Sequence, residues 1–203
     1  MTQLRADAER NRQRILDAAG ELFAQKGLAV GLDEIARHAG VGVGTAYRRF
    51  ANKGELIDAL FEERVDHLVA LAERALEHDD PWQGLKNFLE AAVELHVANR
   101  ALKEMVFAAG GPVAERMAAA RGRIAPLVQE LIGRAQASGD LRDDVAFTDM
   151  PLIQFMVSGV ADIAGPAWRR YLGIVLDGLR TERPSELTHP PLSPDEFERA
   201  LSG

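Results

Sequence analysis

The 203-residue sequence predicts an all-α protein in which a small helical domain precedes a larger one. Apolar residues recur at three- and four-residue spacing along nearly the whole chain, and no run alternates apolar and polar residues as a half-buried strand does. Charge also divides the chain: residues 1–54 carry nine Lys/Arg and six Asp/Glu, whereas residues 55–203 carry fifteen and twenty-five. A small basic domain followed by a larger acidic domain explains this division, and a random distribution of surface charge explains it equally well.

Three helices are predicted at the N-terminus. The first covers residues 8–26 and ends at Gly27, a typical C-cap residue. One face of this helix is apolar and consists of Ile15, Ala19, Leu22 and Phe23. Two short helices follow at residues 32–39 and 43–49. We therefore place the first domain at residues 1–52.

The second domain is predicted at residues 53–183, where turn signals separate longer helices. These helices cover residues 53–77, 82–98, 101–108, 113–137, 149–163 and 167–181. The whole pattern amounts to about nine helices. Four prolines mark residues 184–203 as an extended tail, with a last helical turn at residues 195–201.

The composition argues against several classes of protein. The absence of cysteine excludes disulfides and thiolate metal sites, and the five histidines lie far apart, so we expect no metal and no cofactor. No catalytic motif such as GxSxG is present, so we expect no enzyme. No apolar signal region and no apolar stretch of about 18 residues occur, so we expect a cytoplasmic protein without a membrane partner.

The segment from Leu32 to Lys53 has the pattern of a helix-turn-helix. Ala36 is small where the two helices must cross closely, Gly40 can take the left-handed conformation that the turn requires, and Val41 fills the angle between the helices. The second helix is amphipathic. Its inner side, predicted to face the first two helices, consists of Val43, Ala46, Tyr47 and Phe50.

The outer side of this second helix is predicted to lie in the major groove of DNA. Gly44 lets the helix backbone approach closely and Thr45 can bind a phosphate. Arg48, with Arg49 beside it, can reach a guanine edge or a phosphate. These residue types on one short face indicate a recognition helix.

Three further groups can reach the phosphate backbone. The ring of Tyr47 can pack inward while its hydroxyl binds a phosphate. Lys53 begins the next helix, where free amides attract anions. The third group is a basic arm that consists of Arg5, Arg10, Arg12 and Arg14. Because Asp7 and Glu9 are interleaved, a solvated helix start of mixed charge explains this arm equally well.

Residues 8–60 resemble the DNA-binding domain of the TetR family. The resemblance rests on three segments, ILDAAGELFAQKG (15–27), DEIARHAGV (33–41) and GTAYRRFANKGEL (44–56). It implies a DNA-binding domain, a larger helical domain, dimerisation through the last two long helices, and release of DNA when a small ligand binds. By position, the DNA contacts that it implies are Thr45, Tyr47, Arg48 and Lys53.

The chain departs from the family pattern at two helix caps. Gly31 and Gly42 stand where the family commonly has Ser or Thr before the second helix and Ser before the recognition helix. Glycine is an acceptable N-cap but has no side-chain acceptor for the free amides. A phosphate contact from a capping serine is therefore not expected.

The larger domain offers candidates for a dimer interface and for an effector pocket. The dimer is expected through the helices at residues 149–163 and 167–181, although their apolar faces also fit an intramolecular core. Their apolar residues are Leu152, Phe155, Met156, Gly159, Trp168, Leu172, Val175, Leu176 and Leu179. Candidate ligand contacts are His96, Asn99, Met105, Phe107, Met150 and Gln154, most of which also fit ordinary core or surface positions.

These features predict a ligand-responsive transcriptional regulator, a repressor that binds a palindromic operator in double-stranded DNA as a homodimer. A small molecule would release it from the operator. The alternative is a helical DNA-binding architectural or interaction protein without ligand control, whose binding would ignore sequence and fall steeply with salt.

Overall fold

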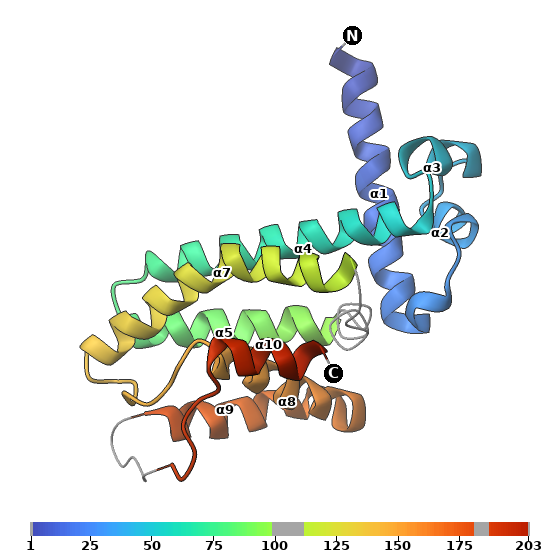
Figure 1. Cartoon of the computed structure of the whole chain (residues 1–203). Helices are drawn as coiled ribbons and strands as arrows, with labels where there is room; N and C mark the ends of the chain where they lie inside the picture. The colour runs from blue at the N-terminus through green and yellow to red at the C-terminus, as the bar shows by residue number, and fades with distance from the viewer. Residues whose placement is uncertain (1, 99–111, 181–186, 203) are drawn as a thin grey trace. The chain divides into compact units, whose positions relative to one another are not determined.

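The computed structural model describes residues 2–98, 112–180 and 187–202. Over these ranges the chain is helical, with one isolated backbone bridge between Leu141 and Arg180 and no strand. Figure 1 shows the helices, which are α1 (Thr2–Lys26), α2 (Leu32–His38), α3 (Val43–Arg49), α4 (Lys53–Leu76), α5 (Pro81–Ala98), α7 (Pro112–Ala137), α8 (Asp149–Ala164), α9 (Trp168–Leu179) and α10 (Pro194–Ser202).

The all-α prediction is confirmed, and most predicted helix ends fall within two residues of the observed ones. Helix α1 is the exception, since it begins at Thr2 rather than at residue 8. Residues 2–7 contain no glycine or proline, so nothing stops the helix from extending toward the N-terminus. The helix predicted at residues 101–108 lies outside the described residues.

The chain forms two compact units. The first unit contains α1, α2, α3 and α4 as far as Arg64, and the second contains the rest of α4 together with α5, α7, α8, α9 and α10. No helix in the described ranges has both the length and the apolar composition that crossing a membrane requires.

The first unit encloses a core of aliphatic and aromatic side chains from all four of its helices. Ile15 and Phe23 of α1, Ile35 of α2 and Ala46 of α3 are fully buried there, and Leu56 joins them from the first turn of α4. The apolar face predicted for the first helix is therefore the face that packs. Burial of these large side chains stabilises the first unit and holds the short helices α2 and α3 against α1.

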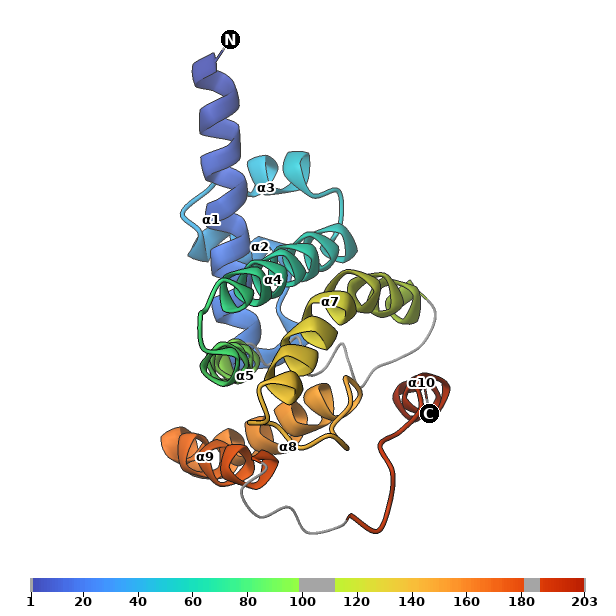
Figure 2. The same cartoon turned by 90° about the vertical axis from the view of Figure 1, so that its left-hand side faces the viewer.

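The second unit encloses a larger core. Leu85 of α5, Leu131 of α7, Met150 of α8 and Leu172 of α9 are buried in it. Helices α8 and α9 lie side by side, as both views show (Figures 1 and 2). The guanidinium of Arg134 on α7 donates to backbone carbonyls of Leu76 and His78, so it satisfies carbonyl groups at the C-terminal end of α4.

The C-terminal segment is ordered against the second unit. Where the sequence predicts a final helical turn at residues 195–201, the structure has the nine-residue helix α10. Ser193 and Glu196 form a reciprocal capping box at its start, which holds the pKa of Glu196 below its usual value. Phe197 is buried, and the hydroxyl of Thr148 donates to the carbonyl oxygen of Leu192 at 2.7 Å.

Candidate nucleic-acid interface

Helices α2 and α3 are joined by the tight turn that the sequence predicts. Gly40 has a φ of +64°, the left-handed conformation that glycine adopts without steric cost. The backbone N–H of Val41 donates to the carbonyl oxygen of Ala36 at 3.0 Å, which closes the end of α2. Nη2 of Arg14 donates to the carbonyl oxygen of Gly40 at 3.2 Å. Helix α1 therefore holds the turn through one of the arginines assigned to the basic arm.

One ion pair and one hydrogen-bonded pair of side chains link α2 to α1. Nζ of Lys26 lies 2.5 Å from Oε1 of Glu34, and Nε2 of His38 lies 2.7 Å from Oε2 of Glu21. The hydrogen bond from Lys26 and its positive charge hold the pKa of Glu34 below its usual value. Because these pairs flank the buried Ile35, α2 is a fixed platform for α3.

The inner face predicted for α3 is only partly right. Ala46 and Phe50 are buried, as expected, but Val43 is 38% exposed and Tyr47 is 47% exposed. A seven-residue helix makes only two turns, so it can bury one narrow stripe, here Ala46 with the following Phe50. Val43 and Tyr47 flank this stripe. The solvent-facing surface of α3 is therefore wider than the sequence predicts.

The exposed surface of α3 carries the predicted DNA contacts. A Cβ built at Gly44 would meet no atom within 4 Å, so that position is open. Nη2 of Arg48 donates to Oγ1 of Thr45 at 3.2 Å, and Arg49 is exposed beside them. The structure brings Gly44, Thr45 and Arg48 together on one helix face. This face has room for another molecule to approach the backbone at Gly44, and it carries a hydroxyl and a guanidinium.

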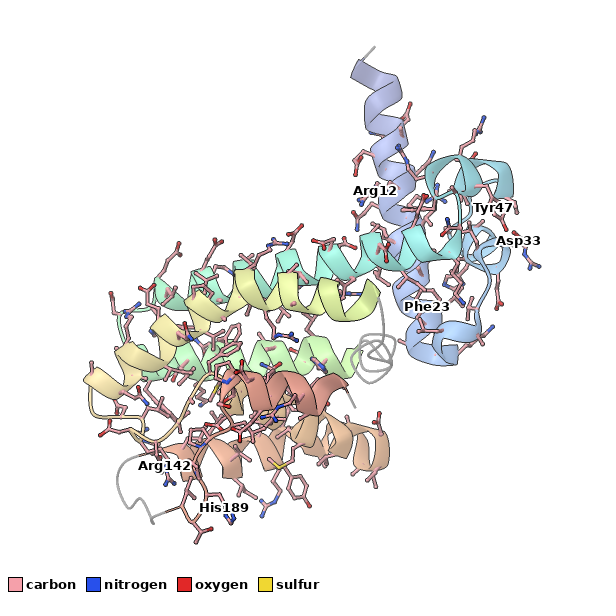
Figure 3. All side chains as sticks on the ribbon, viewed as in Figure 1. Arg12, Phe23, Asp33, Tyr47, Arg142 and His189 are labelled. Carbon is pink, nitrogen blue, oxygen red and sulfur yellow. The ribbon has the colours of Figure 1, made fainter. Side chains whose placement is uncertain are left out.

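Tyr47 has a neighbour that the sequence analysis missed. The carboxylate of Asp33, in the first turn of α2, accepts a hydrogen bond from the Tyr47 hydroxyl and raises the pKa of that phenol. Figure 3 labels both residues on the α2–α3 part of the first unit. The sequence does show Asp33 in the first turn of a short helix. An acid at that position is also explained by its favourable interaction with the helix dipole, so the sequence alone does not indicate a bond to Tyr47.

The ammonium group of Lys53 lies near the C-terminal end of α1, in contact with Phe23 and with Leu28 just after the helix. Its Nζ donates to the carbonyl oxygen of Leu28 and lies 5.7 Å from the centroid of the Phe23 ring. An ammonium has three donors, so this arrangement leaves N–H groups for another acceptor. Next to it, Oδ1 of Asn52 accepts from the backbone N–H of Glu55 at 3.0 Å and caps α4.

The basic arm is folded into α1 and carries compensating acids. Arg10 pairs with Asp7, and Nη1 of Arg12 lies 3.6 Å from Oε1 of Glu9. Arg5 lies on α1, but its side chain is outside the description. The described arm therefore combines exposed arginines with intrahelical ion pairs, each of which is weak at a solvent-exposed site.

The second unit places the predicted ligand contacts among buried residues. His96 and Gln154 are 7% and 9% exposed, and Met150 lies in the core. The His96 ring meets the Phe155 ring edge-on, with centroids 5.1 Å apart. Asn99, Met105 and Phe107 lie outside the described residues.

The apolar faces predicted for dimerisation divide between core and surface. Trp168, Leu172 and Leu176 of α9 are buried within the chain's own core, while Val175 and Leu179 pack against it. The exposed apolar side chains on the two helices are Leu152, Met156, Ile163, Tyr171 and Ile174. A helix that packs on its own unit and also presents an apolar surface needs two apolar stripes. The spacing of apolar residues alone does not show which of the two stripes is buried.

Comparison with known proteins gives consistent matches over most of the chain. The family model for bacterial regulatory proteins of the tetR family matches residues 15–60, and the model for the C-terminal domain of SbtR-like transcriptional regulators matches residues 80–181. An HTH-type transcriptional regulator of Staphylococcus aureus is 27% identical over 105 residues, which is 51% of this chain and 57% of that protein. The chain thus matches little more than half the length of that curated relative.

Two solved structures are similar over nearly their whole length. The TetR transcription regulatory protein from Mycobacterium vanbaalenii is 34% identical, with a TM-score of 0.65 over 88% of this chain and 99% of that one. A TetR transcriptional regulator from Streptomyces coelicolor is 32% identical, with a TM-score of 0.63 over 83% of this chain and 98% of that one.

Proposed function

The chain belongs to the TetR family of bacterial transcriptional regulators, and from this premise we propose that it is a ligand-responsive repressor that binds a palindromic operator as a homodimer. The observation that carries the DNA-binding part is the exposed face of α3. Gly44, Thr45 and Arg48 share that face, and the buried Ala46 anchors the helix behind it.

The roles of the contact residues follow from their chemistry. Gly44 lets the backbone of α3 approach the major groove, and Arg48 reads a base edge or binds a phosphate. Thr45 and Arg49 bind phosphates, and so does the hydroxyl of Tyr47 after it leaves Asp33. Lys53 contributes a donor near the start of α4, in addition to the bond that it makes to Leu28.

The homodimer is proposed to form through α8 and α9. Their exposed apolar side chains include Ile163, which is 90% exposed, and Ile174, which is 54% exposed. Exposed apolar side chains grouped on two adjacent helices favour association with a second copy, and a two-fold axis would make a four-helix bundle. Such a dimer would present two recognition helices to successive major grooves, about 34 Å apart.

Ligand control is proposed to act through the second unit. A small molecule bound near His96 and Gln154 would favour a domain arrangement in which the recognition helices no longer match the operator. Both side chains are buried on α5 and α8, where a polar group orients a ligand among apolar neighbours. Loss of the ligand response in His96→Ala and Gln154→Ala, with the fold intact, is the expected result.

The DNA-binding proposal is tested by selecting bound sequences from a random DNA pool with the purified full chain. We expect an enriched palindrome whose binding weakens in Arg48→Ala and in Tyr47→Phe. Arg74→Ala, which removes an exposed arginine from the part of α4 in the second unit, is the matched control and should bind like the unmodified chain. A salt titration of the enriched site and of random DNA completes the measurement.

Two outcomes would contradict this function. Binding without sequence preference that falls steeply with salt would indicate a nonspecific architectural protein. An enriched site that Arg48→Ala and Tyr47→Phe bind as well as the unmodified chain would show that the α3 face is not the recognition surface.

A further inference from the structure

A hollow of about 420 Å³ lies in the second unit, at one end of the α8–α9 pair. It is bounded by the N-terminal half of α8, the C-terminal half of α9, the loop before α8 and residues 187–191 of the C-terminal segment. Figure 3 shows Arg142 of the loop and His189 of the segment at the same end of the second unit. The segment lies beyond residues 80–181, which match the C-terminal family model, so membership of the family does not account for the wall that it adds.

Hydrogen bonds fix the walls of this hollow. Nε2 of Gln136 donates to the carbonyl oxygen of Arg142 at 3.2 Å. The backbone N–H of Arg142 donates to the carbonyl oxygen of Leu179 at 3.1 Å, which ties the loop to the end of α9. The bond from Thr148 to Leu192 ties the C-terminal segment to the start of α8. The hollow is therefore preformed, and an occupant does not have to create it.

The charged groups of the hollow are engaged within the chain. Nη2 of Arg142 donates to Oδ2 of Asp144 at 2.7 Å, and the carboxylate of Asp149 accepts from the backbone N–H of Ala146 at 2.8 Å. Most of the remaining lining is aliphatic and includes Val145, Leu152, Ile153, Met156, Val175 and Leu179. Such a lining favours an apolar occupant.

The other end of the α8–α9 pair carries exposed apolar side chains. One face of α8, at spacings of four, three and four residues, consists of Leu152, Met156, Gly159 and Ile163. Leu152 and Met156 line the hollow, whereas Ile163 is 90% exposed near the opposite end of the helix. The three-residue turn Gly165–Ala167 joins α8 to α9, so the two helices are antiparallel, and the exposed Tyr171 lies at the same end of the pair as Ile163.

A two-fold axis through the middle of the α8–α9 pair would place the exposed apolar end of each copy over the hollow of the other. Such an interface is self-complementary, so each contact occurs twice. The middle of the pair can be approached closely, since a Cβ built at Gly159 or at Gly173 would meet no atom within 4 Å. The hollow has enough room, because a cavity of roughly 150 Å³ holds a group as large as benzene. A second copy of this chain therefore supplies the apolar side chains that fit the hollow.

We propose that the hollow is a socket in the homodimer interface, filled by Ile163 and Tyr171 of the partner subunit, with residues 187–191 as its outer wall. This inference rests on the homodimer through α8 and α9 proposed above. It adds the direction in which the two copies pair, and it gives the C-terminal segment a part in dimerisation. The contact that the segment provides is Leu187, which is exposed and lines the hollow.

The test is a double-mutant cycle on the dissociation constant of the dimer, measured by sedimentation of the full chain. Gly178→Phe fills the hollow from its own chain, where a Cβ meets no atom within 4 Å, and Ile163→Ala removes the side chain that would enter it. We expect each variant to raise the constant at least tenfold. The double variant should raise it by less than the product of the two effects, because both changes remove the same contact. Gly122→Phe, at an open position on α7, is the control for added bulk and should dimerise like the unmodified chain.

The cycle identifies a contact between copies because its two positions are far apart within one chain. The rise along α9 from Trp168 to Gly178 alone is about 15 Å. Substitutions more than about 7–10 Å apart usually have additive effects. Coupling between Gly178→Phe and Ile163→Ala would therefore arise across the interface.

Leu187→Glu tests the part played by the C-terminal segment. It places a charge in an apolar socket, so we expect the dimer to weaken at least tenfold, whereas Ala119→Glu on α7 should have no effect. The inference is overturned if Gly178→Phe leaves the dimer unchanged, if its effect and that of Ile163→Ala simply multiply, or if Leu187→Glu dimerises normally. Multiplying effects would leave the homodimer through α8 and α9 standing, whereas a monomeric unmodified chain would contradict that homodimer as well.

Discussion

The Tyr47 hydroxyl lies beside a carboxylate instead of facing open solvent. Its hydrogen bond to Asp33 and the negative charge of that carboxylate raise the pKa of the phenol, because both favour the protonated form. If Tyr47 binds a phosphate in the DNA complex, this bond must be exchanged for one to the phosphate. Asp33 then stands near a second negative group. At the residue scale, the same carboxylate orders the side chain in the free protein and opposes its contact with DNA.

We predict that Asp33→Asn lowers the pKa of Tyr47 and strengthens DNA binding. The sequence has two tyrosines, so a Tyr171→Phe background leaves one phenol to titrate by ultraviolet absorbance. A raised folded-state pKa stabilises the fold fully below the unfolded pKa, and this contribution is lost as the pH rises through the folded pKa. Asp33→Asn should remove that alkaline dependence. An unchanged titration curve would contradict the Asp33–Tyr47 bond.

Two glycines four residues apart are predicted to respond in opposite ways to alanine. Gly40→Ala forces an L side chain to a φ of +64°, and its Cβ would lie 2.7 Å from Nη2 of Arg14, so we expect a loss of about 1 kcal/mol or more in the free energy of unfolding. Gly44→Ala meets nothing within 4 Å and gains roughly 0.5 kcal/mol from helix propensity.

Denaturant unfolding and operator affinity together test this pair. Gly44→Ala should be more stable and yet bind DNA more weakly, because its methyl group separates α3 from the groove. Equal or tighter DNA binding by Gly44→Ala would mean that the backbone of α3 does not approach DNA at this position.

At the scale of elements, α3 begins without a side-chain cap. Gly42 occupies the N-cap position with extended backbone, and a Cβ added there would be 3.7 Å from Oγ1 of Thr45, an ordinary contact. Gly42→Ser supplies an oxygen that can accept from the backbone N–H of Gly44, the second residue of the helix, so we predict a gain of a few tenths of a kcal/mol. Gly42→Ala adds the same Cβ without the oxygen and should be less stable than Gly42→Ser. A lower melting temperature for Gly42→Ser than for the unmodified chain would contradict the position of the cap.

The ends of the helices could be predicted from the sequence, whereas the contacts of their side chains could not. Helix ends carry local signals, such as Gly40 after α2 and Pro81 at the start of α5, and these were predicted closely. The start of α1 was not, because residues 2–7 contain no signal that stops a helix. The direction in which a side chain points depends on groups that are distant in the sequence. Tyr47 forms a hydrogen bond to Asp33, and Arg14 donates to the carbonyl oxygen of Gly40. Periodicity gives the direction of a side chain but not the group that it meets.

For the whole molecule, the distribution of charge along the chain affects how strongly it can bind DNA. Residues 1–54 have a net charge of +3 within a chain of net charge −7, so the segment that carries α1, α2 and α3 must bind DNA while the rest of the chain is repelled by it. One small α3 face provides few contacts against this repulsion. Two copies held together would double the contacts and raise the effective concentration of the second face.

The dimer is therefore predicted to be necessary for operator binding, and Ile174→Glu tests this. Ile174 is 54% exposed and does not belong to the core of the second unit, so a charge there should leave the monomer folded. At a two-fold interface it would place two like charges in an apolar environment, which is costly without partners. We expect sedimentation to give the monomer near 22.2 kDa and operator affinity to fall at least tenfold, with a shallower salt dependence. Ala119→Glu places a charge at an exposed apolar residue of α7, outside α8 and α9, and it should remain dimeric. If both variants sediment as dimers and bind the operator normally, the second copy packs elsewhere. If Ile174→Glu is monomeric but binds with full affinity, a single α3 face is sufficient and the palindrome is not required.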